Sequence, residues 1–137
     1  MSVFKLYMVD CGLLGALVEV PVAVMLIENK VFSEFKGMFT EQYVLQQFIV
    51  NPGSSVSYWS SERSDGELDF VFQLNDKIWP IEVKAEENLH AKSLRSFVSR
   101  HPELRGVRFS MSDYREEAWM TNIPLYALPS VLKHTNP

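Results

Sequence analysis

The chain has 137 residues, of which 47% are hydrophobic and 22% are charged. This length and composition are typical of one globular domain, residues 1–137, and they exclude intrinsic disorder, collagen and low-complexity sequence. The formal net charge of −4 argues against a protein that coats nucleic acid through overall positive charge. The single cysteine, Cys11, can form neither an internal disulfide nor a thiolate metal cage, so we expect a reducing, cytoplasmic compartment.

No targeting segment or membrane partner is expected. The N-terminus lacks a charged region followed by an apolar block and a small-residue cleavage site. The most apolar stretch, residues 13–27, contains Glu19 and Pro21 and is shorter than the roughly 20 residues that span a bilayer. We interpret this stretch either as part of the core or as a surface for a protein partner.

Residues 1–36 are expected to form a mostly helical preamble. The pattern predicts a short strand over residues 5–9, a compact helix over residues 13–17 and a second helix from Pro21 to Glu28. Proline suits the first turn of a helix because the N–H that it lacks would have no partner within the helix there.

Residues 37–128 are expected to form the core of the domain. The predicted elements are a helix over 38–49 after Gly37, strands over 56–60, 68–74 and 78–84, a helix over 89–100 capped by Asn88, and strands over 107–111 and 123–128. This order of helix, three strands, helix, strand and strand is typical of one α/β domain built around a mixed sheet.

The predicted hairpin formed by the second and third strands brings two acidic residues together. A tight turn at residues 75–76 sets a register that places Asp69 directly opposite Glu82. Lys84 lies two residues beyond Glu82 and therefore projects from the same face. If this face is buried, the two carboxylates need a cation, which can be Lys84, a divalent metal ion or both; if it is exposed, water suffices. The alternate, apolar positions are expected to face the core: Leu68, Phe70, Phe72, Trp79, Ile81 and Val83.

The helix before the hairpin carries a carboxylate within its apolar stripe. Glu41 lies at helical spacing among Met38, Val44, Leu45 and Phe48. A carboxylate on a core-facing stripe is costly unless it is paired or bound to a metal ion, so Glu41 is a candidate ligand. The alternatives are a first-turn glutamate favoured by the helix dipole and a salt bridge to Lys84.

Glu41, Asp69, Glu82 and Lys84 together are the set that metal-dependent phosphodiester hydrolysis needs. Carboxylate oxygens hold Mg²⁺ or Mn²⁺ with several waters still attached, and the metal ion lowers the pKa of one of those waters. A lysine beside the ion orients the attacking water and stabilises the anionic transition state. We take all four as candidate catalytic residues and the three acids as candidate metal ligands.

Lys92, Arg95 and Arg100 on the predicted helix 89–100 are candidate nucleic-acid contacts. Between residues 84 and 108 the chain carries six Lys or Arg against three Glu, so a local basic patch is compatible with the acidic total. The alternative is that these residues form only the solvent-exposed side of the helix, since its core side is marked by Leu94, Phe97 and Val98.

Several of these motifs resemble known families. Residues 67–71 (ELDFV) and 80–84 (PIEVK) resemble the core of the PD-(D/E)XK nuclease-like, or restriction-endonuclease-like, superfamily. Other segments resemble one family, domain of unknown function forty-one forty-three: residues 5–14, 37–41, 58–59, 92–94 and 123–126. The resemblance extends over most of the chain, from about Lys5 to Leu128. That family forms the C-terminal part of predicted bacterial and archaeal AAA+-type ATPases.

The resemblance implies an αβββαβ core in which Asp69 and Glu82 are metal ligands, Lys84 is the catalytic lysine and Glu41 is the helical acid. It also implies an AAA+ ATPase domain in the parent chain. No Gly-x-x-x-x-Gly-Lys-Ser/Thr phosphate loop occurs in this sequence, so no nucleotide site is expected here. The chain is therefore expected to be either a C-terminal fragment or a stand-alone relative.

The expected function is a Mg²⁺- or Mn²⁺-dependent DNA endonuclease domain that serves an ATPase. A second hypothesis is a catalytically silent module that docks nucleic acid or regulates the ATPase, which the acidic net charge and the apolar stretch 13–27 favour. A third is a protein-assembly domain with no role in nucleic-acid binding.

Overall fold

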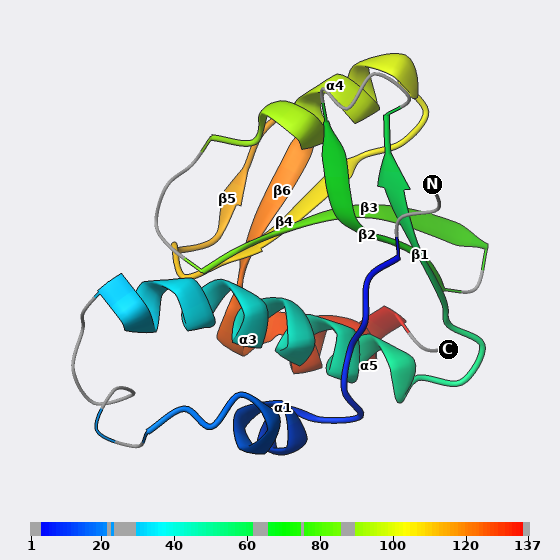
Figure 1. Cartoon of the computed structure of the whole chain (residues 1–137). Helices are drawn as coiled ribbons and strands as arrows, with labels where there is room; N and C mark the ends of the chain where they lie inside the picture. The colour runs from blue at the N-terminus through cyan, green and yellow to red at the C-terminus, as the bar shows by residue number, and fades with distance from the viewer. Residues whose placement is uncertain are drawn as a thin grey trace.

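The computed structural model describes residues 4–21, 23, 30–61, 66–74, 76–85 and 90–135. These residues form an α/β domain in which a mixed six-stranded sheet carries helices on both faces (Figure 1). The helices and strands, labelled as in Figure 1, are α1 (Cys11–Leu17), α3 (Lys30–Ile49), β1 (Ser55–Ser60), β2 (Glu67–Leu74), β3 (Lys77–Lys84), α4 (Lys92–Arg100), β4 (Gly106–Ser110), β5 (Arg115–Glu116), β6 (Met120–Pro124) and α5 (Leu128–Thr135), with a 3₁₀ turn at Leu125–Ala127.

The strand order in the sheet is β1-β2-β3-β4-β6-β5. The first three strands form an antiparallel meander, whereas β3, β4 and β6 run parallel and β5 pairs antiparallel with β6. Parallel neighbours require a crossover connection, and α4 supplies it between β3 and β4. The predicted α/β class and mixed sheet are confirmed.

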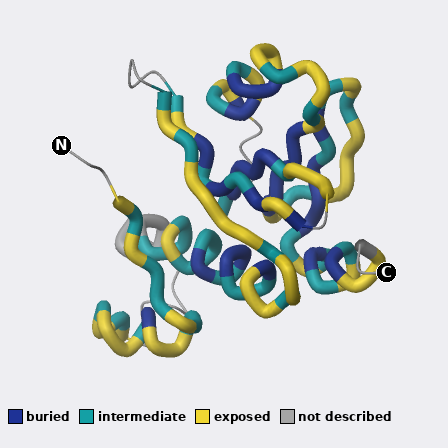
Figure 2. Tube along the Cα trace, turned by 90° about the vertical axis from the view of Figure 1, so that its right-hand side faces the viewer, coloured by how far each residue is buried: buried dark blue, intermediate teal, exposed yellow. Residues whose placement is uncertain are grey.

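Two apolar clusters hold the helices to the two faces of the sheet. On one face α3 and α5 pack against the strands, and the ring of Phe48 in α3 stacks on Phe72 with 3.8 Å between the ring centroids. On the other face α4 packs through Leu94, Phe97 and Val98. Figure 2 shows buried residues concentrated in the sheet and in the inner sides of these helices, whereas α1 is mostly exposed.

A β-bulge interrupts β2 at Asp69 and Phe70. The register of β1 against β2 shifts by one residue at this point, so that Tyr58 lies opposite both of them. The extra residue reverses the alternation of side chains along β2. Leu68 therefore packs beneath α4, while Phe70 packs beneath α3. The prediction that Leu68 shares a core face with Phe70 is wrong for this reason.

Other corrections concern the N-terminal part. The described residues of the segment predicted as a strand, 5–9, have no regular secondary structure; the backbone of Met8 bonds instead to the side chain of Gln42. The helix predicted to start after Gly37 begins at Lys30, because one glycine inside a long helix costs only about 1 kcal/mol and does not end it. Most of the helix predicted from Pro21 to Glu28 lies outside the described residues.

The C-terminal part also differs from the prediction. The strand predicted over 123–128 ends at Pro124, whose missing N–H cannot extend a ladder, and the chain continues into the 3₁₀ turn and α5. Pro129 then lies in the first turn of α5, where proline is tolerated. The turn residue Asn75 and the expected cap Asn88 lie outside the described residues. No helix in the described ranges has both the length and the apolar character needed to cross a membrane.

Candidate functional site

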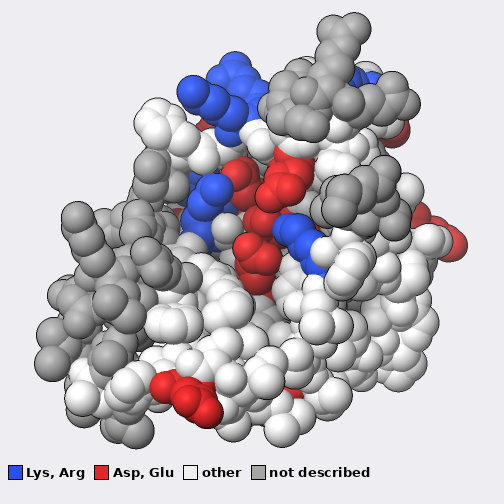
Figure 3. Space-filling view, in the orientation of Figure 1, with Lys and Arg blue, Asp and Glu red and all other residues white. Residues whose placement is uncertain are grey.

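A group of charged side chains lies where the N-terminal segment meets α3, β2 and β3. Figure 3 shows acidic and basic groups gathered over the middle of the face between α3 and α4. We define the charged cluster as Lys5, Glu41, Asp69, Glu82 and Lys84, which are joined by ion pairs and by the effect of their charges on one another. It contains all four residues that the sequence predicts to be catalytic, together with one lysine that it does not predict. Besides burial, the charge of Glu67 also raises the pKa of Glu41 and Asp69.

Glu41 is held by the N-terminal segment. The hydroxyl of Tyr7 donates a hydrogen bond of 3.0 Å to Oε2 of Glu41, and Nζ of Lys5 lies 3.9 Å from the same oxygen. Burial, followed by the charge of Asp69, raises the pKa of Glu41. Two structural alternatives for Glu41 are wrong. It is not in the first turn of its helix, because α3 begins at Lys30. The lysine that pairs with it is Lys5 and not Lys84.

Asp69 is fixed by a backbone hydrogen bond. Its Oδ2 accepts a bond of 2.7 Å from the N–H of Val83, while its Oδ1 lies 3.6 Å from Nζ of Lys5. The hairpin has the predicted register from Leu74 to Phe70, but the ladder between β2 and β3 stops there, so Asp69 and Glu82 are not a cross-strand pair. Burial raises the pKa of Asp69 despite the hydrogen bond and the nearby lysines.

Glu82 is the most buried acid of the cluster. Only 8% of its side chain is exposed, and its Oε1 lies 2.9 Å from Nζ of Lys84. Its other oxygen, Oε2, is buried without a hydrogen-bond partner among the described residues. Burial, opposed by Lys84 and reinforced by the charge of Asp69, raises the pKa of Glu82. Burial is the first cause of the raised pKa in all three carboxyl groups, and perturbed pKa values of this kind cluster at functional sites as well as in structural ion-pair networks.

A buried polar layer that sequence reasoning missed adjoins Glu82. Arg108 lies opposite Glu82 in the parallel pairing of β3 and β4, and it is 1% exposed. Its Nε donates 2.8 Å to Oδ1 of Asn122, which also accepts 2.8 Å from the hydroxyl of Ser110. Burial lowers the pKa of Arg108, and the charge of Glu82 counteracts this. The sequence signal for this layer is that two polar residues, Arg108 and Ser110, alternate with apolar residues along β4.

Lys5 and Tyr7 were also missed as site residues. Only a weak signal for them exists, because the two residues are separated by one position and an extended segment places such side chains on one side. Their contacts with Glu41 span 36 and 34 positions of the chain, and no local pattern predicts such contacts.

The candidate nucleic-acid contacts lie on the exposed side of α4. Lys92, Arg95 and Arg100 are exposed, whereas Leu94, Phe97 and Val98 are buried as predicted. The guanidinium of Arg95 lies 5.7 Å from the ring centre of Trp119, and that of Arg100 lies 5.8 Å from the ring centre of Trp59. Both arginines therefore make cation–π contacts within the domain, and their role in nucleic-acid binding stays a prediction.

The described part of the chain contains no group of three His, Cys, Asp or Glu side chains positioned to hold a metal ion. Lys5 contacts both Glu41 and Asp69, and Lys84 contacts Glu82. Each of the three carboxylates therefore pairs with a lysine. The donor chemistry still suits a hard cation, because Mg²⁺ is usually held by only one or two carboxylates plus waters and substrate phosphate. The buried, unpartnered Oε2 of Glu82 is one such donor.

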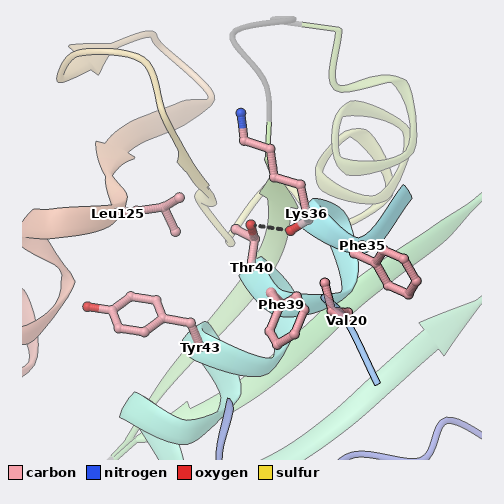
Figure 4. Close-up of a pocket in the computed structure, with 7 residues that line it drawn as sticks. All are labelled: Val20, Phe35, Lys36, Phe39, Thr40, Tyr43 and Leu125. Carbon is pink, nitrogen blue, oxygen red and sulfur yellow. Dashed lines mark hydrogen bonds between the residues drawn. The ribbon is translucent and has the colours of Figure 1, made fainter. Parts of the chain in front are cut away.

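A separate apolar cavity of about 430 Å³ lies between α3 and the end of β6 (Figure 4). Its lining consists of Val20, Phe35, Lys36, Phe39, Thr40, Tyr43 and Leu125. The hydroxyl of Thr40 donates a bond of 2.6 Å to the carbonyl of Lys36, so this polar group is already satisfied within the helix. The rest of the wall is largely apolar and lacks the acid–base groups of the charged cluster.

The fold and site define an α/β domain that carries a half-buried cluster of three acids and two lysines beside strands β2 and β3 of a mixed sheet. The family model for Domain of unknown function (DUF4143) matches residues 36–128, and the chain belongs to this family. The match includes Glu41, Asp69, Glu82 and Lys84, while Lys5 lies before it. No curated protein and no solved structure matches the chain significantly.

Proposed function

We propose that this domain is a nuclease-like module that uses the charged cluster to hydrolyse phosphodiester bonds in DNA with Mg²⁺ or Mn²⁺. The observation that carries the proposal is the convergence of Glu41, Asp69 and Glu82 from one helix and two strands, with one carboxylate oxygen buried and unpartnered. A buried carboxylate oxygen is costly without a hydrogen-bond partner or a cation. A divalent ion at this position would remove that cost.

The order of elements supports the same proposal. The succession α3, β1, β2, β3, α4 and β4 is the αβββαβ order expected of a PD-(D/E)XK core. Asp69 and Glu82 come from its second and third strands, and Lys84 follows Glu82 by two residues. We include this nuclease-like core in the proposal, together with an AAA+-type ATPase domain in the parent chain.

The residues of the cluster would divide the chemistry as follows. Asp69 and Glu82 would hold the divalent ion, which when bound lowers the pKa of a water and neutralises charge that develops on the phosphate. The ammonium of Lys84, fixed 2.9 Å from Glu82, would orient the attacking water and donate to a phosphate oxygen. Glu41, whose pKa is raised by burial, would act as the proton acceptor.

A second candidate function is a module without cleavage activity that docks a protein or regulates the ATPase. The observation that favours it is a set of exposed apolar side chains in the N-terminal segment and α1, namely Phe4, Leu6, Val9, Leu13 and Leu17. Large apolar groups gathered on a surface are typical of protein contacts. In this function the lysines of the cluster would serve only to stabilise the fold.

Incubation with supercoiled plasmid distinguishes the two functions. The wild-type chain should nick or linearise the plasmid with Mn²⁺ and lose this activity in EDTA, whereas Glu82→Gln and Asp69→Asn should be inactive while remaining folded by circular dichroism. The variant Glu103→Gln, which changes an exposed glutamate elsewhere, is the matched control and should cut like the wild type. Equal behaviour of wild type and Glu82→Gln would contradict cleavage at this site.

A further inference from the structure

We propose that Lys5 is the second cation of the metal site. On this proposal the ammonium of Lys5 fills a subsite between Glu41 and Asp69, so that the cluster accepts a single divalent ion, held by Asp69 and Glu82. The inference rests on the proposed function, because it assigns the two cation positions of the same cluster.

The distances identify Lys5 as a bridging cation. Its Nζ lies 3.9 Å from Glu41 and 3.6 Å from Asp69, both longer than the 2.9 Å between Lys84 and Glu82. A lysine that formed one optimised ion pair would approach its partner to about 2.7–2.9 Å. An ammonium at intermediate distance from two acids instead neutralises both, as a metal ion between them would.

The position of Lys5 is set by the segment that carries it. Two residues later, the hydroxyl of Tyr7 donates to Glu41. The next residue, Met8, is bound through its backbone to the side-chain amide of Gln42. Oε1 of Gln42 accepts from the N–H of Met8 at 2.9 Å, and Nε2 donates to its C=O at 2.8 Å. Gln42 is 1% exposed, and its two part-buried bonds anchor the segment to α3. These contacts hold the backbone of the segment in place and so position the ammonium of Lys5 next to Glu41 and Asp69.

The two oxygens of Asp69 separate the subsites. Oδ1 faces Lys5, whereas Oδ2 accepts from Val83, the residue after Glu82. Glu82, the residue before Val83, supplies the buried Oε2 that has no hydrogen-bond partner among the described residues. Nucleases with two metal ions place them about 3.5–4 Å apart around shared carboxylates. Here the position between Glu41 and Asp69 is taken by the side chain of Lys5, which neutralises charge but cannot activate a water.

Titration with Mn²⁺ alone, by isothermal calorimetry and native mass spectrometry, tests the assignment without using activity. The wild-type chain should bind one ion, and Lys5→Ala should bind two, because the ammonium that lies next to both Glu41 and Asp69 is then removed. The double variant Lys5→Ala/Glu41→Gln should return to one ion. Lys77→Ala, which removes an exposed lysine at the hairpin turn, is the matched control and should bind one.

Two results would overturn the assignment of Lys5: two ions on the wild-type chain, or a single ion on a folded Lys5→Ala. The failure of this inference is distinguishable from that of the proposed function. A wild-type chain that binds one ion but cuts no DNA would refute cleavage and leave the assignment of Lys5 intact. A chain that cuts DNA but gains no second ion when Lys5 is removed would refute the assignment alone.

Discussion

The carboxylate of Asp69 bonds to the backbone N–H of Val83 at 2.7 Å, at the point where the ladder between β2 and β3 stops. The side chain thereby takes the place that a backbone carbonyl would occupy in a regular hairpin. Rotation of Asp69 away from the cluster would leave the N–H of Val83 without its partner, which costs about 1–3 kcal/mol if no water replaces it. The bulge therefore orients one acid of the cluster before any ligand binds.

Replacing Lys84 with methionine should separate metal binding from catalysis. The ammonium of Lys84 lies beside Glu82 but is not a metal ligand in the proposed arrangement. We expect plasmid cleavage to fall by roughly 10²–10³-fold, because one electrostatic donor to the transition state is lost. Mn²⁺ binding, measured by calorimetry, should be retained. Undiminished cleavage, or an equal loss of metal binding, would contradict the role given to Lys84.

The free energy of unfolding should depend on pH because of the three buried acids of the cluster. Burial raises the pKa of Glu41, Asp69 and Glu82 in the folded chain, so the folded state binds protons more tightly than the unfolded state at these groups. Their contribution to the free energy of unfolding is therefore largest at low pH and declines as the pH rises above the ordinary carboxyl range. In urea denaturation at several pH values, Glu41→Gln should show a smaller decline than the wild type.

The exposed Glu103 provides the control for this experiment. Glu103→Gln should keep the decline of the wild-type chain, since its carboxylate lies outside the cluster. Parallel stability curves for Glu41→Gln and the wild type would contradict the account of Glu41.

Gln42 should anchor the N-terminal segment. Its side-chain amide bonds to both the N–H and the C=O of Met8, and Gln42→Ala removes both bonds. We expect a loss of about 1–3 kcal/mol in the free energy of unfolding, since water can reach part of the exposed backbone. Hydrogen exchange at the amide of Met8 should become faster. Gln46→Ala, which removes a single bond of 3.2 Å to Cys11, should have a smaller effect, and a larger loss there would argue against the anchor.

Two glycines should respond to alanine in opposite ways. A methyl group at Gly106 would lie 3.1 Å from side-chain atoms of Leu94, so Gly106→Ala should destabilise the domain by about 1–3 kcal/mol through overpacking. Gly37 lies inside α3 with open space around it, and Gly37→Ala should stabilise the helix by up to about 1 kcal/mol. Thermal denaturation of both variants checks this, and a Gly106→Ala variant as stable as the wild type would contradict the packing of α4 on β4.

Much of the sheet could be predicted because its strands alternate regularly. The pattern of β2 and β3 fixed the hairpin and its register from Leu74 to Phe70. It could not predict the bulge, because Glu67, Leu68, Asp69 and Phe70 continue the alternation of polar and apolar residues without a break. The extra residue becomes visible only against β1, where Tyr58 lies opposite two positions.

The site could be predicted in part for a similar reason. Glu41, Asp69 and Glu82 are acids at apolar or paired positions of their predicted elements, and they lie in one cluster. Lys5 could not be recognised in this way, since its contacts join an irregular segment to a helix and a strand far along the chain. The predicted start of α3 is wrong because Gly37 is a weak boundary signal that a long helix tolerates.

A crystal structure after soaking in Mn²⁺ tests the central claim most directly. Data collected at the manganese absorption edge locate the ion by anomalous scattering, without assumptions about its ligands. The account predicts a single strong anomalous peak within bonding distance of Asp69 and of Oε2 of Glu82. A fully soaked crystal with no peak at these two carboxylates would contradict it.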